Sequence, residues 1–306
     1  MKICFINWWS NGVNDFFYFF VKKYINAAAK IDKKNPDIAF CSVFGDRNKI
    51  INFVNNNKKC VHIFFTGEST IHQSHKQYDD YLLDIVDISL GFKYINHDKY
   101  NRFPLWLTYI NMDSNMGKPE LEFSKLFSFV NNENRNKFCC ILNNHDNFNT
   151  RTNIFNKLNS YKKVDSGGNW NKNIDYKIKQ GEKYKNKWLS NYKFNICCEA
   201  IIENGYITEK IFECLLAGCI PIYFVNNENN LIEENVINQD IIIKFNNNNI
   251  DNVIEYIKLL DINTFEYHKF INQPIITDNA INEIYKKYNQ LSLLTIKSLE
   301  KKKCKN

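Results

Sequence analysis

Short apolar runs that alternate with longer helical patterns are the feature that most restricts the fold of this chain. Four runs rich in Ile, Val and Phe have the length of strands: residues 2–7, 37–44, 61–65 and 87–92. Residues 14–30 follow the first run and place aromatic side chains at helical spacing, behind an expected N-cap at Asn14 or Asp15. This alternation is typical of βαβ units, whose strands form a parallel sheet. The sequence therefore predicts an α/β fold.

The alternation restarts after two polar stretches, at residues 111–120 and 131–137, and this indicates a second domain. Beyond them we expect strands at 138–144, 193–200 and 219–224, helices at 150–160, 183–191 and 208–218, and a turn at D-S-G-G-N. Three helical patterns close the chain at 251–260, 262–272 and 278–300. A length of 306 residues exceeds what one hydrophobic core usually organises. We predict two domains, 1–133 and 134–275, and a C-terminal helix at about 276–306 that returns to the first.

The charge pattern argues against a nucleic-acid partner. The formal net charge of +7 comes from 40 basic and 33 acidic residues, which are scattered along the chain. A nucleic-acid site would need clustered Lys and Arg with interleaved aromatic residues. Only the final E-K-K-K-C-K-N resembles such a cluster, and we interpret it as a solvated tail. A mildly basic chain still accommodates an anionic substrate such as a nucleotide diphosphate.

The ten cysteines do not suggest a metal or disulfide framework. Cys139–Cys140 and Cys197–Cys198 are adjacent pairs within apolar runs, where buried reduced thiols fit well. No C-x-x-C or Cys/His spacing suited to zinc occurs. The N-terminal apolar run is too short for a signal peptide, and no run approaches the roughly 18 apolar residues that span a bilayer. We expect a soluble, cytoplasmic protein without an integral membrane segment.

Residues 192–224 form the most informative segment, which we expect to run strand, loop, helix and strand. Thr208 stands at the expected N-cap of the helix, and Gly218 at its end. Free backbone N–H groups at the start of a helix suit a pyrophosphate, and Lys210 adds a positive charge there. Glu209 can accept hydrogen bonds from ribose hydroxyls. An ordinary capped amphipathic helix would show the same features, so this pattern alone leaves both interpretations open.

Four motifs occur in a fixed order along the chain. They are F-T-G-E at 65–68, G-F-K-Y-I-N-H-D-K-Y-N-R-F-P-L-W-L at 91–107, N-S-Y-K-K-V-D-S-G-G at 159–168, and E-A-I-I-E-N-G-Y-I-T-E-K at 199–210. The last is followed by A-G-C-I-P-I-Y. In order and spacing these motifs resemble the family-10 glycosyltransferases, the α-1,3/4-fucosyltransferases. The resemblance extends over roughly residues 60 to 270.

The resemblance implies a GT-B architecture, in which two Rossmann-like domains face each other across a cleft. It also implies inversion at the anomeric carbon, with no bound metal and no cofactor. In that scheme an acceptor hydroxyl attacks the fucosyl carbon of GDP-fucose, a carboxylate removes the proton, and cationic groups stabilise the departing diphosphate. We therefore expect an enzyme that transfers L-fucose from this nucleotide-sugar donor to a hydroxyl of a glycan or glycoprotein acceptor.

Motif positions assign roles to individual residues. Glu68 corresponds to the general base, and Arg151 to a guanidinium that binds the donor and offsets leaving-group charge. Of the donor-site residues, the tyrosine is expected to contact phosphate or sugar, and the lysine the phosphates. The full donor set that the resemblance implies is Arg151, Glu199, Tyr206, Thr208, Glu209 and Lys210.

Two departures from the family pattern keep alternatives open. Ala200 replaces an asparagine that the family has beside its glutamate. The family also follows its proline with an aromatic residue and a glycine, whereas this chain continues from Pro221 through Ile-Tyr-Phe to Val225. The alternatives are the same fold with another nucleotide sugar, and a catalytically silent protein that binds a glycan or a nucleotide.

Overall fold

The computed structural model describes residues 1–10, 12–13, 15–110, 135–146, 149–176, 178, 182–227 and 229–304. These residues group into two compact units. The first unit takes in the described residues up to 110, together with 203–206 and 282–304. The second unit takes in those between 135 and 202 and between 207 and 281. The domain boundary predicted after residue 133 lies outside the described residues.

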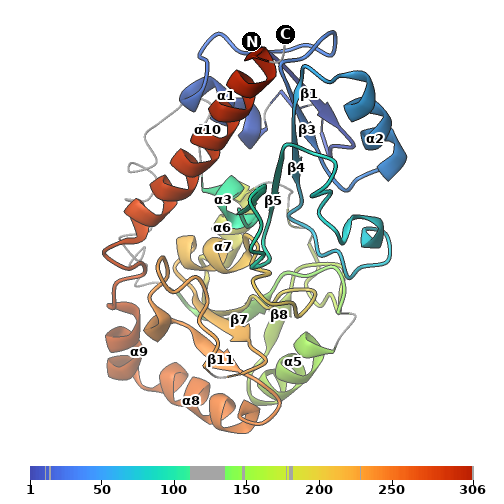
Figure 1. The fold of residues 1–306 in the computed structure, drawn as a ribbon. Helices are drawn as coiled ribbons and strands as arrows, with labels where there is room; N and C mark the ends of the chain where they lie inside the picture. The colour runs from blue at the N-terminus through green and yellow to red at the C-terminus, as the bar shows by residue number, and fades with distance from the viewer. Residues whose placement is uncertain are drawn as a thin grey trace. The chain divides into compact units, whose positions relative to one another are not determined.

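The first unit is built on a parallel sheet with strand order β2-β1-β3-β4-β5-β6 (Figure 1). The strands are β1 Lys2–Ile6, β2 Lys30–Ile31, β3 Ile38–Cys41, β4 Val61–Phe65, β5 Ile88–Gly91 and β6 Tyr100–Arg102. Its helices are α1 Phe16–Tyr24, α2 Arg47–Asn56, the short α3 Trp106–Tyr109 and the long α10 Ala280–Cys304. Asp15 is the N-cap of α1, as predicted, and its side chain accepts a hydrogen bond from the Phe17 N–H.

Both faces of this sheet are covered, and β4 shows why. Phe64 clusters with Ile50 and Val54 of α2. The next residue, Phe65, contacts Phe17 of α1 instead, with the ring centroids 4.9 Å apart. Successive side chains of a strand point to opposite faces, so a strand covered on both sides has no polar alternation. All five residues of the V-H-I-F-F strand are accordingly buried.

Helix α10 brings the end of the chain onto the first unit, beside α1 (Figure 1). Tyr288 is fully buried, and its hydroxyl donates to the carbonyl oxygen of Leu107 at 2.9 Å. Near the end of the helix, Lys302 pairs with Asp87 at 2.9 Å. The other carboxylate oxygen of Asp87 lies 3.3 Å from Nδ1 of His62. Burial favours the neutral acid, but hydrogen bonds from His62 and Lys302 outweigh it and lower the pKa of Asp87 to about 2.

The second unit is a parallel sheet with strand order β11-β10-β9-β7-β8. The strands are β7 Lys137–Ile141, β8 Val164–Ser166, β9 Tyr192–Ile196, β10 Ile220–Phe224 and β11 Ile243–Phe245. The helices are α5 Thr150–Tyr161, α6 Glu182–Leu189, α7 Lys210–Leu216, α8 Ile250–Ile262 and α9 Thr264–Ile271. Figure 1 shows α6 and α7 on one face of this sheet and α5, α8 and α9 on the other.

The structure corrects two local predictions. The D-S-G-G-N turn begins two residues later than predicted, because Asp165 and Ser166 belong to β8 and pair with β7. The N-cap of α7 is Glu209, not Thr208. The Thr208 hydroxyl is instead bonded to the carboxylate of Glu199, 2.8 Å away, and is therefore not used to cap the helix.

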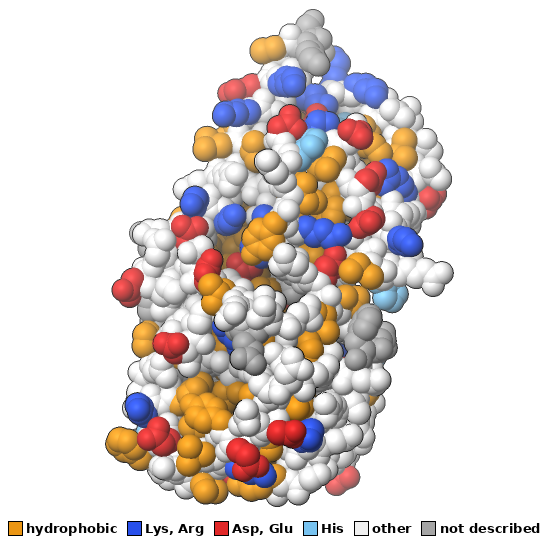
Figure 2. Space-filling model, turned by 60° about the horizontal axis from the view of Figure 1, so that its bottom comes forward, with side chains coloured by type: hydrophobic (Ala, Val, Ile, Leu, Met, Phe, Trp, Pro, Cys, Tyr) orange, Lys and Arg blue, Asp and Glu red, His pale blue; other side chains and the backbone are white. Residues whose placement is uncertain are grey.

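Charged side chains of both signs share the surface. Figure 2 shows lysine, arginine, aspartate and glutamate side chains mixed over the face that it presents. Several form ion pairs, such as Lys157 with Asp251 at 2.6 Å and Lys162 with Asp261 at 2.9 Å. Among the helices of the described residues, none combines the length and the apolar character needed to cross a membrane.

Candidate functional site

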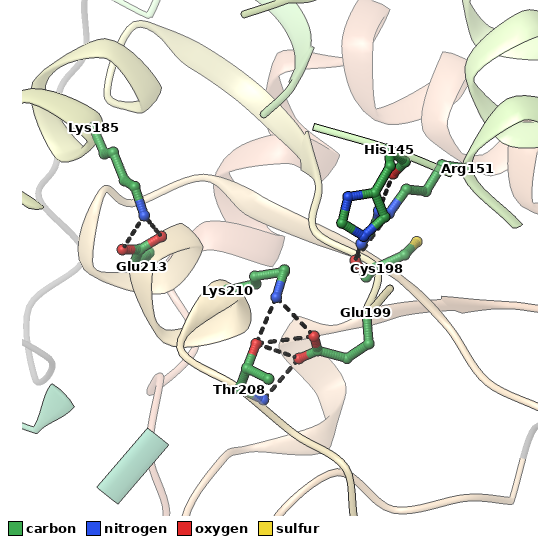
Figure 3. Close-up of polar contacts among 8 residues, drawn as sticks. All are labelled: His145, Arg151, Lys185, Cys198, Glu199, Thr208, Lys210 and Glu213. Atoms are coloured by element: carbon green, nitrogen blue, oxygen red, sulfur yellow. Dashed lines mark hydrogen bonds and ion pairs between the residues drawn. The ribbon is translucent and has the colours of Figure 1, made fainter. Parts of the chain in front are cut away.

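A network of hydrogen bonds beyond the C-terminal end of β9 joins three of the predicted donor-site residues (Figure 3). The buried carboxylate of Glu199 accepts from the backbone N–H of Thr208 at 2.7 Å and from its hydroxyl at 2.8 Å. The same carboxylate accepts from Nζ of Lys210 at 2.9 Å. Lys210 Nζ also donates to the Thr208 hydroxyl at 2.8 Å. Each member of the network is thus held by the other two.

Lys210 provides an accessible positive charge in this network. Its side chain is 25% exposed, whereas that of Glu199 is 5% exposed. Burial alone would lower the pKa of the ammonium group, but the charges of Glu199 and Glu209 outweigh burial and raise it above the ordinary 10.5. Lys210 is therefore a cation at neutral pH. Glu209 is itself partly exposed at the start of α7.

Arg151, on α5, is buried beside this network with an exposed fraction of 1%. Its Nε and Nη2 donate to the carbonyl oxygen of Cys198 at 3.2 and 2.7 Å, and its Nη1 donates to that of His145 at 2.5 Å (Figure 3). These bonds tie the loop after β7 to the loop after β9. In the part of the chain that is described, Arg151 forms no ion pair, so carbonyl dipoles balance its charge.

Close packing fixes the loops around these residues. Asp146 lies before Asn149, the N-cap of α5, and its carboxylate accepts from the backbone N–H groups of Arg151 and Thr152 at 3.1 and 2.7 Å. At Gly168 an added Cβ would lie 1.9 Å from the carbonyl oxygen of Asn143, so only glycine fits. Close packing against Asn143, which follows β7, therefore accounts for Gly168 of the S-G-G motif.

An ion pair between two helices supports α7 from its other side. Nζ of Lys185, on α6, lies 2.9 Å from the carboxylate of Glu213 on α7 (Figure 3). Burial raises the pKa of Glu213, and the charge of Lys185 partly offsets that rise. The pair fixes α7, which begins at Lys210, against α6.

Two predicted site residues, Glu68 and Tyr206, belong to the first unit, while the others belong to the second. Tyr206 is buried against Phe92, with ring centroids 4.9 Å apart. Its loop is anchored there by Glu203, which pairs with Lys93 at 3.1 Å and accepts from the hydroxyl of Ser69 at 2.6 Å.

Glu68 lies in a hollow of the first unit with a volume of about 220 Å³. It follows β4 in a turn held by Thr66, whose Oγ1 accepts from the Glu68 N–H at 3.1 Å and donates to the Glu68 carbonyl at 2.8 Å. Among described residues, none forms a hydrogen bond or an ion pair with the Glu68 carboxylate. The other residues lining the hollow are Trp9, Asp15, Phe16, Phe44, Gly67, Leu105, Thr108 and Tyr109.

Three aromatic residues of this hollow were not among the predicted site residues. Trp9, Phe44 and Tyr109 are large side chains that remain 45%, 42% and 44% exposed. A signal for the first of them was present, since two adjacent tryptophans directly follow the first predicted strand. The carboxyl ends of parallel strands are where open α/β sheets bind ligands.

The residues that depart from the family pattern differ in their surroundings. Val225 is buried, and its N–H donates to the carbonyl oxygen of Phe245 at 2.9 Å, so it extends the pairing of β10 with β11. Ala200 is partly exposed and directly follows Glu199. Within the described ranges, no group of three His, Cys, Asp or Glu side chains could hold a metal ion. The absence of a metal from the reaction stays a prediction.

Two family models match the chain in succession. The model described as the N-terminal domain of α-(1,3)-fucosyltransferase FucT matches residues 3–109. The model described as the C-terminal part of glycosyltransferase family 10 (fucosyltransferase) matches residues 131–275. Together they take in both units.

Relatives and solved structures agree with these matches. The α-(1,3)-fucosyltransferase FucT of Helicobacter pylori is 24% identical over 316 residues, which is 93% of this chain and 61% of that protein. The chain thus spans about three fifths of that relative. Crystal structures of an α1,3-fucosyltransferase, alone and with GDP-fucose, match with TM-scores of 0.67 and 0.66 at 22% identity, covering 95% of this chain and 90% of theirs. This likeness confirms the predicted α/β fold of the GT-B type.

Proposed function

Because the chain belongs to glycosyltransferase family 10, the fucosyltransferases, we propose that it transfers L-fucose from GDP-fucose to a hydroxyl group of a glycan acceptor. The related α1,3-fucosyltransferase with GDP-fucose bound supports this choice of donor. The observation that carries the proposal is the network beyond β9, in which Glu199 and Thr208 hold the partly exposed Lys210 in place. A fixed cation at a sheet edge suits the diphosphate of a nucleotide sugar.

In this proposal the diphosphate binds at the cationic edge of the second unit. Lys210 contacts phosphate oxygens directly, and Arg151 acts on them from its buried position beside the network. A buried charge without a counter-charge is unfavourable, so an anionic ligand stabilises Arg151. Glu209 accepts from the ribose hydroxyls, and Tyr206 contacts phosphate or sugar. Glu199 and Thr208 serve the donor by holding Lys210.

Glu68 is the general base of the proposed reaction. Its carboxylate takes the proton of the acceptor hydroxyl while that oxygen attacks the anomeric carbon of fucose. The bond from this carbon to the diphosphate oxygen breaks on the opposite face, so the configuration inverts. The electron pair leaves with GDP, whose charge Lys210 and Arg151 stabilise. Because these cations meet the diphosphate charge, the proposed course uses no metal and no cofactor.

A panel of nucleotide sugars tests the choice of donor without knowledge of the acceptor. Release of free nucleotide is measured with GDP-fucose, other GDP sugars, UDP sugars and dTDP sugars. We expect the fastest release from GDP-fucose. A preference for a UDP or dTDP sugar would contradict the proposal and support the alternative raised by Ala200. Binding of GDP with turnover of no donor would indicate a silent binding protein.

A further inference from the structure

We propose that the hollow beside Glu68 binds one neutral pyranose ring of the acceptor, stacked on the exposed face of Trp9. This inference rests on the proposed function, in which Glu68 is the base that activates an acceptor hydroxyl. Beyond that function, the inference names the residues that bind the acceptor and states how much of the acceptor they bind.

The sheet topology brings the residues of this site together. Trp9 follows β1, Phe44 follows β3 and Glu68 follows β4. These three strands are neighbours in the parallel sheet of the first unit. Their carboxyl ends therefore lie along one edge, where open α/β sheets bind ligands.

Trp9 is held rigidly from behind by its neighbours. The indole of Trp8 stacks on it with ring centroids 4.3 Å apart and an interplanar angle of 26°. Nε1 of Trp8 in turn donates to the buried carboxylate of Asp15 at 2.7 Å. The second oxygen of Asp15 accepts from the N–H of Phe17 at 2.9 Å, at the start of α1. A platform fixed in this way loses little conformational entropy when a ligand binds.

Aromatic walls around a carboxylate suit a sugar better than a charged ligand. Phe44 meets Trp9 edge to face, with centroids 5.6 Å apart at 83°, and Tyr109 also lines the hollow. The face of an aromatic ring carries partial negative charge, which attracts the polarised C–H groups of a pyranose. Glu68 and Asp15 line the same hollow and would repel a diphosphate. The lining therefore disfavours an anion, and the proposed reaction, whose acceptor is a glycan hydroxyl, makes the expected ligand a neutral sugar that is apolar on one face and rich in hydroxyl groups.

The volume of the hollow sets how much of the acceptor it takes. At about 220 Å³ it lies below the 300–1,000 Å³ that is typical of pockets for drug-sized ligands. A single ring fills a space of this size, and a nucleotide or a longer glycan would extend beyond it. The remainder of the acceptor therefore lies outside the hollow.

The test measures acceptor binding and donor binding separately. Methyl β-glycosides of glucose, galactose and N-acetylglucosamine are titrated, in the presence of GDP, into the wild-type protein and into Trp9→Ala. We expect Trp9→Ala to weaken binding of the preferred glycoside by about tenfold, which corresponds to about 1.4 kcal/mol. Trp9→Phe keeps an aromatic face and should lose less. Phe265→Ala is the matched control, since this ring is 73% exposed on α9 and lies outside the hollow.

The outcomes separate this inference from the proposed function. Equal glycoside affinity in wild type and Trp9→Ala overturns the inference, and so does a wild-type protein that binds none of the glycosides. Failure of the proposed function looks different, because the wild-type protein then releases no GDP from GDP-fucose, whether or not glycosides bind. Thermal unfolding of each variant confirms that it is folded. If Trp9→Ala does not fold, Phe44→Ala takes its place, with the same weakening expected.

Discussion

The two units present their charged groups in opposite ways. In the second unit, Lys210 is locked to Glu199 and Thr208 by hydrogen bonds of 2.8–2.9 Å, and the buried Arg151 holds the loop beside it. In the first unit, Glu68 lies in a hollow lined by exposed aromatic rings. The first arrangement is preformed for an anion. The second leaves a carboxylate without hydrogen-bond partners among the described residues, as the proposed base requires.

Hydrogen bonding differs between the two glutamates, and the difference supports the proposed role of Glu68 as the base. The Glu199 carboxylate accepts hydrogen bonds from the Thr208 N–H, the Thr208 hydroxyl and the Lys210 ammonium. Those three donors engage both carboxylate oxygens, which leaves little acceptor capacity for a substrate proton. Glu68 has no such donors among the residues that the structure describes. Position in a sequence motif alone does not separate the two glutamates, whereas their hydrogen bonding differs.

The largest predicted effect is on the Glu68 side of the comparison. Glu68→Gln removes the base, and we expect the rate of sugar transfer to fall by about 10²–10⁴-fold. Transfer is measured with GDP-fucose and a saturating acceptor. Glu255→Gln is the control, because this carboxylate is 72% exposed on α8. A rate for Glu68→Gln equal to that of the control would remove Glu68 from the mechanism.

Replacement of Lys210 is predicted to have smaller effects on two quantities, the free energy of unfolding and the affinity for GDP. Lys210→Met leaves the Glu199 carboxylate buried without its cation, so the free energy of unfolding should fall by about 3 kcal/mol. GDP affinity should also fall, by about tenfold or more, because hydrogen bonds to charged groups contribute about 1.5–3 kcal/mol. Denaturant unfolding and calorimetric titration measure the two losses.

A double variant separates the two roles of Lys210. Glu199→Gln combined with Lys210→Met removes the unpaired buried charge, and we expect it to recover much of the lost stability. It should not recover GDP affinity, because the cation is still missing. Recovery of both quantities would show that Lys210 only supports the loop and does not contact the donor.

The smallest predicted effect lies away from both sites, at the ion pair that holds α10. The pKa of Asp87 is about 2 in the folded state, below its ordinary 3.8, so its contribution to stability is present above about pH 4 and is lost as the pH falls towards 2. Asp87→Asn should reduce the free energy of unfolding by about 2 kcal/mol at pH 7. Urea unfolding from pH 7 down to pH 2 should show this difference shrinking. A difference that does not depend on pH would contradict the assignment.

Strands with a long apolar run of residues were predictable from the sequence. I-P-I-Y-F of β10 is a continuous apolar run and V-H-I-F-F of β4 is interrupted only by His62, as expected for strands buried on both faces. The strands β2 and β6 were not predicted, because they have two and three residues and include polar ones, such as Y-N-R. Their pairing with β1 and β5 defines them, and no local pattern records that pairing.

Short sequence motifs identified individual residues of the candidate sites, but they did not predict the contacts among those residues. The motif named Glu199 and Lys210, but their contact depends on how the intervening loop folds. The burial of Arg151 against carbonyl oxygens could not be predicted from its position at the start of a helix. The aromatic hollow was harder to predict, because Trp9 and Phe44 are far from Glu68 in the sequence. The strand order of the sheet brings the three residues together.

Titration of GDP into wild type, Glu68→Gln and Lys210→Met tests most directly whether the donor and the base belong to different units. We predict that Glu68→Gln binds GDP as tightly as wild type, while Lys210→Met binds it about tenfold more weakly or worse. Equal weakening in both variants would contradict it, and so would wild-type affinity in Lys210→Met.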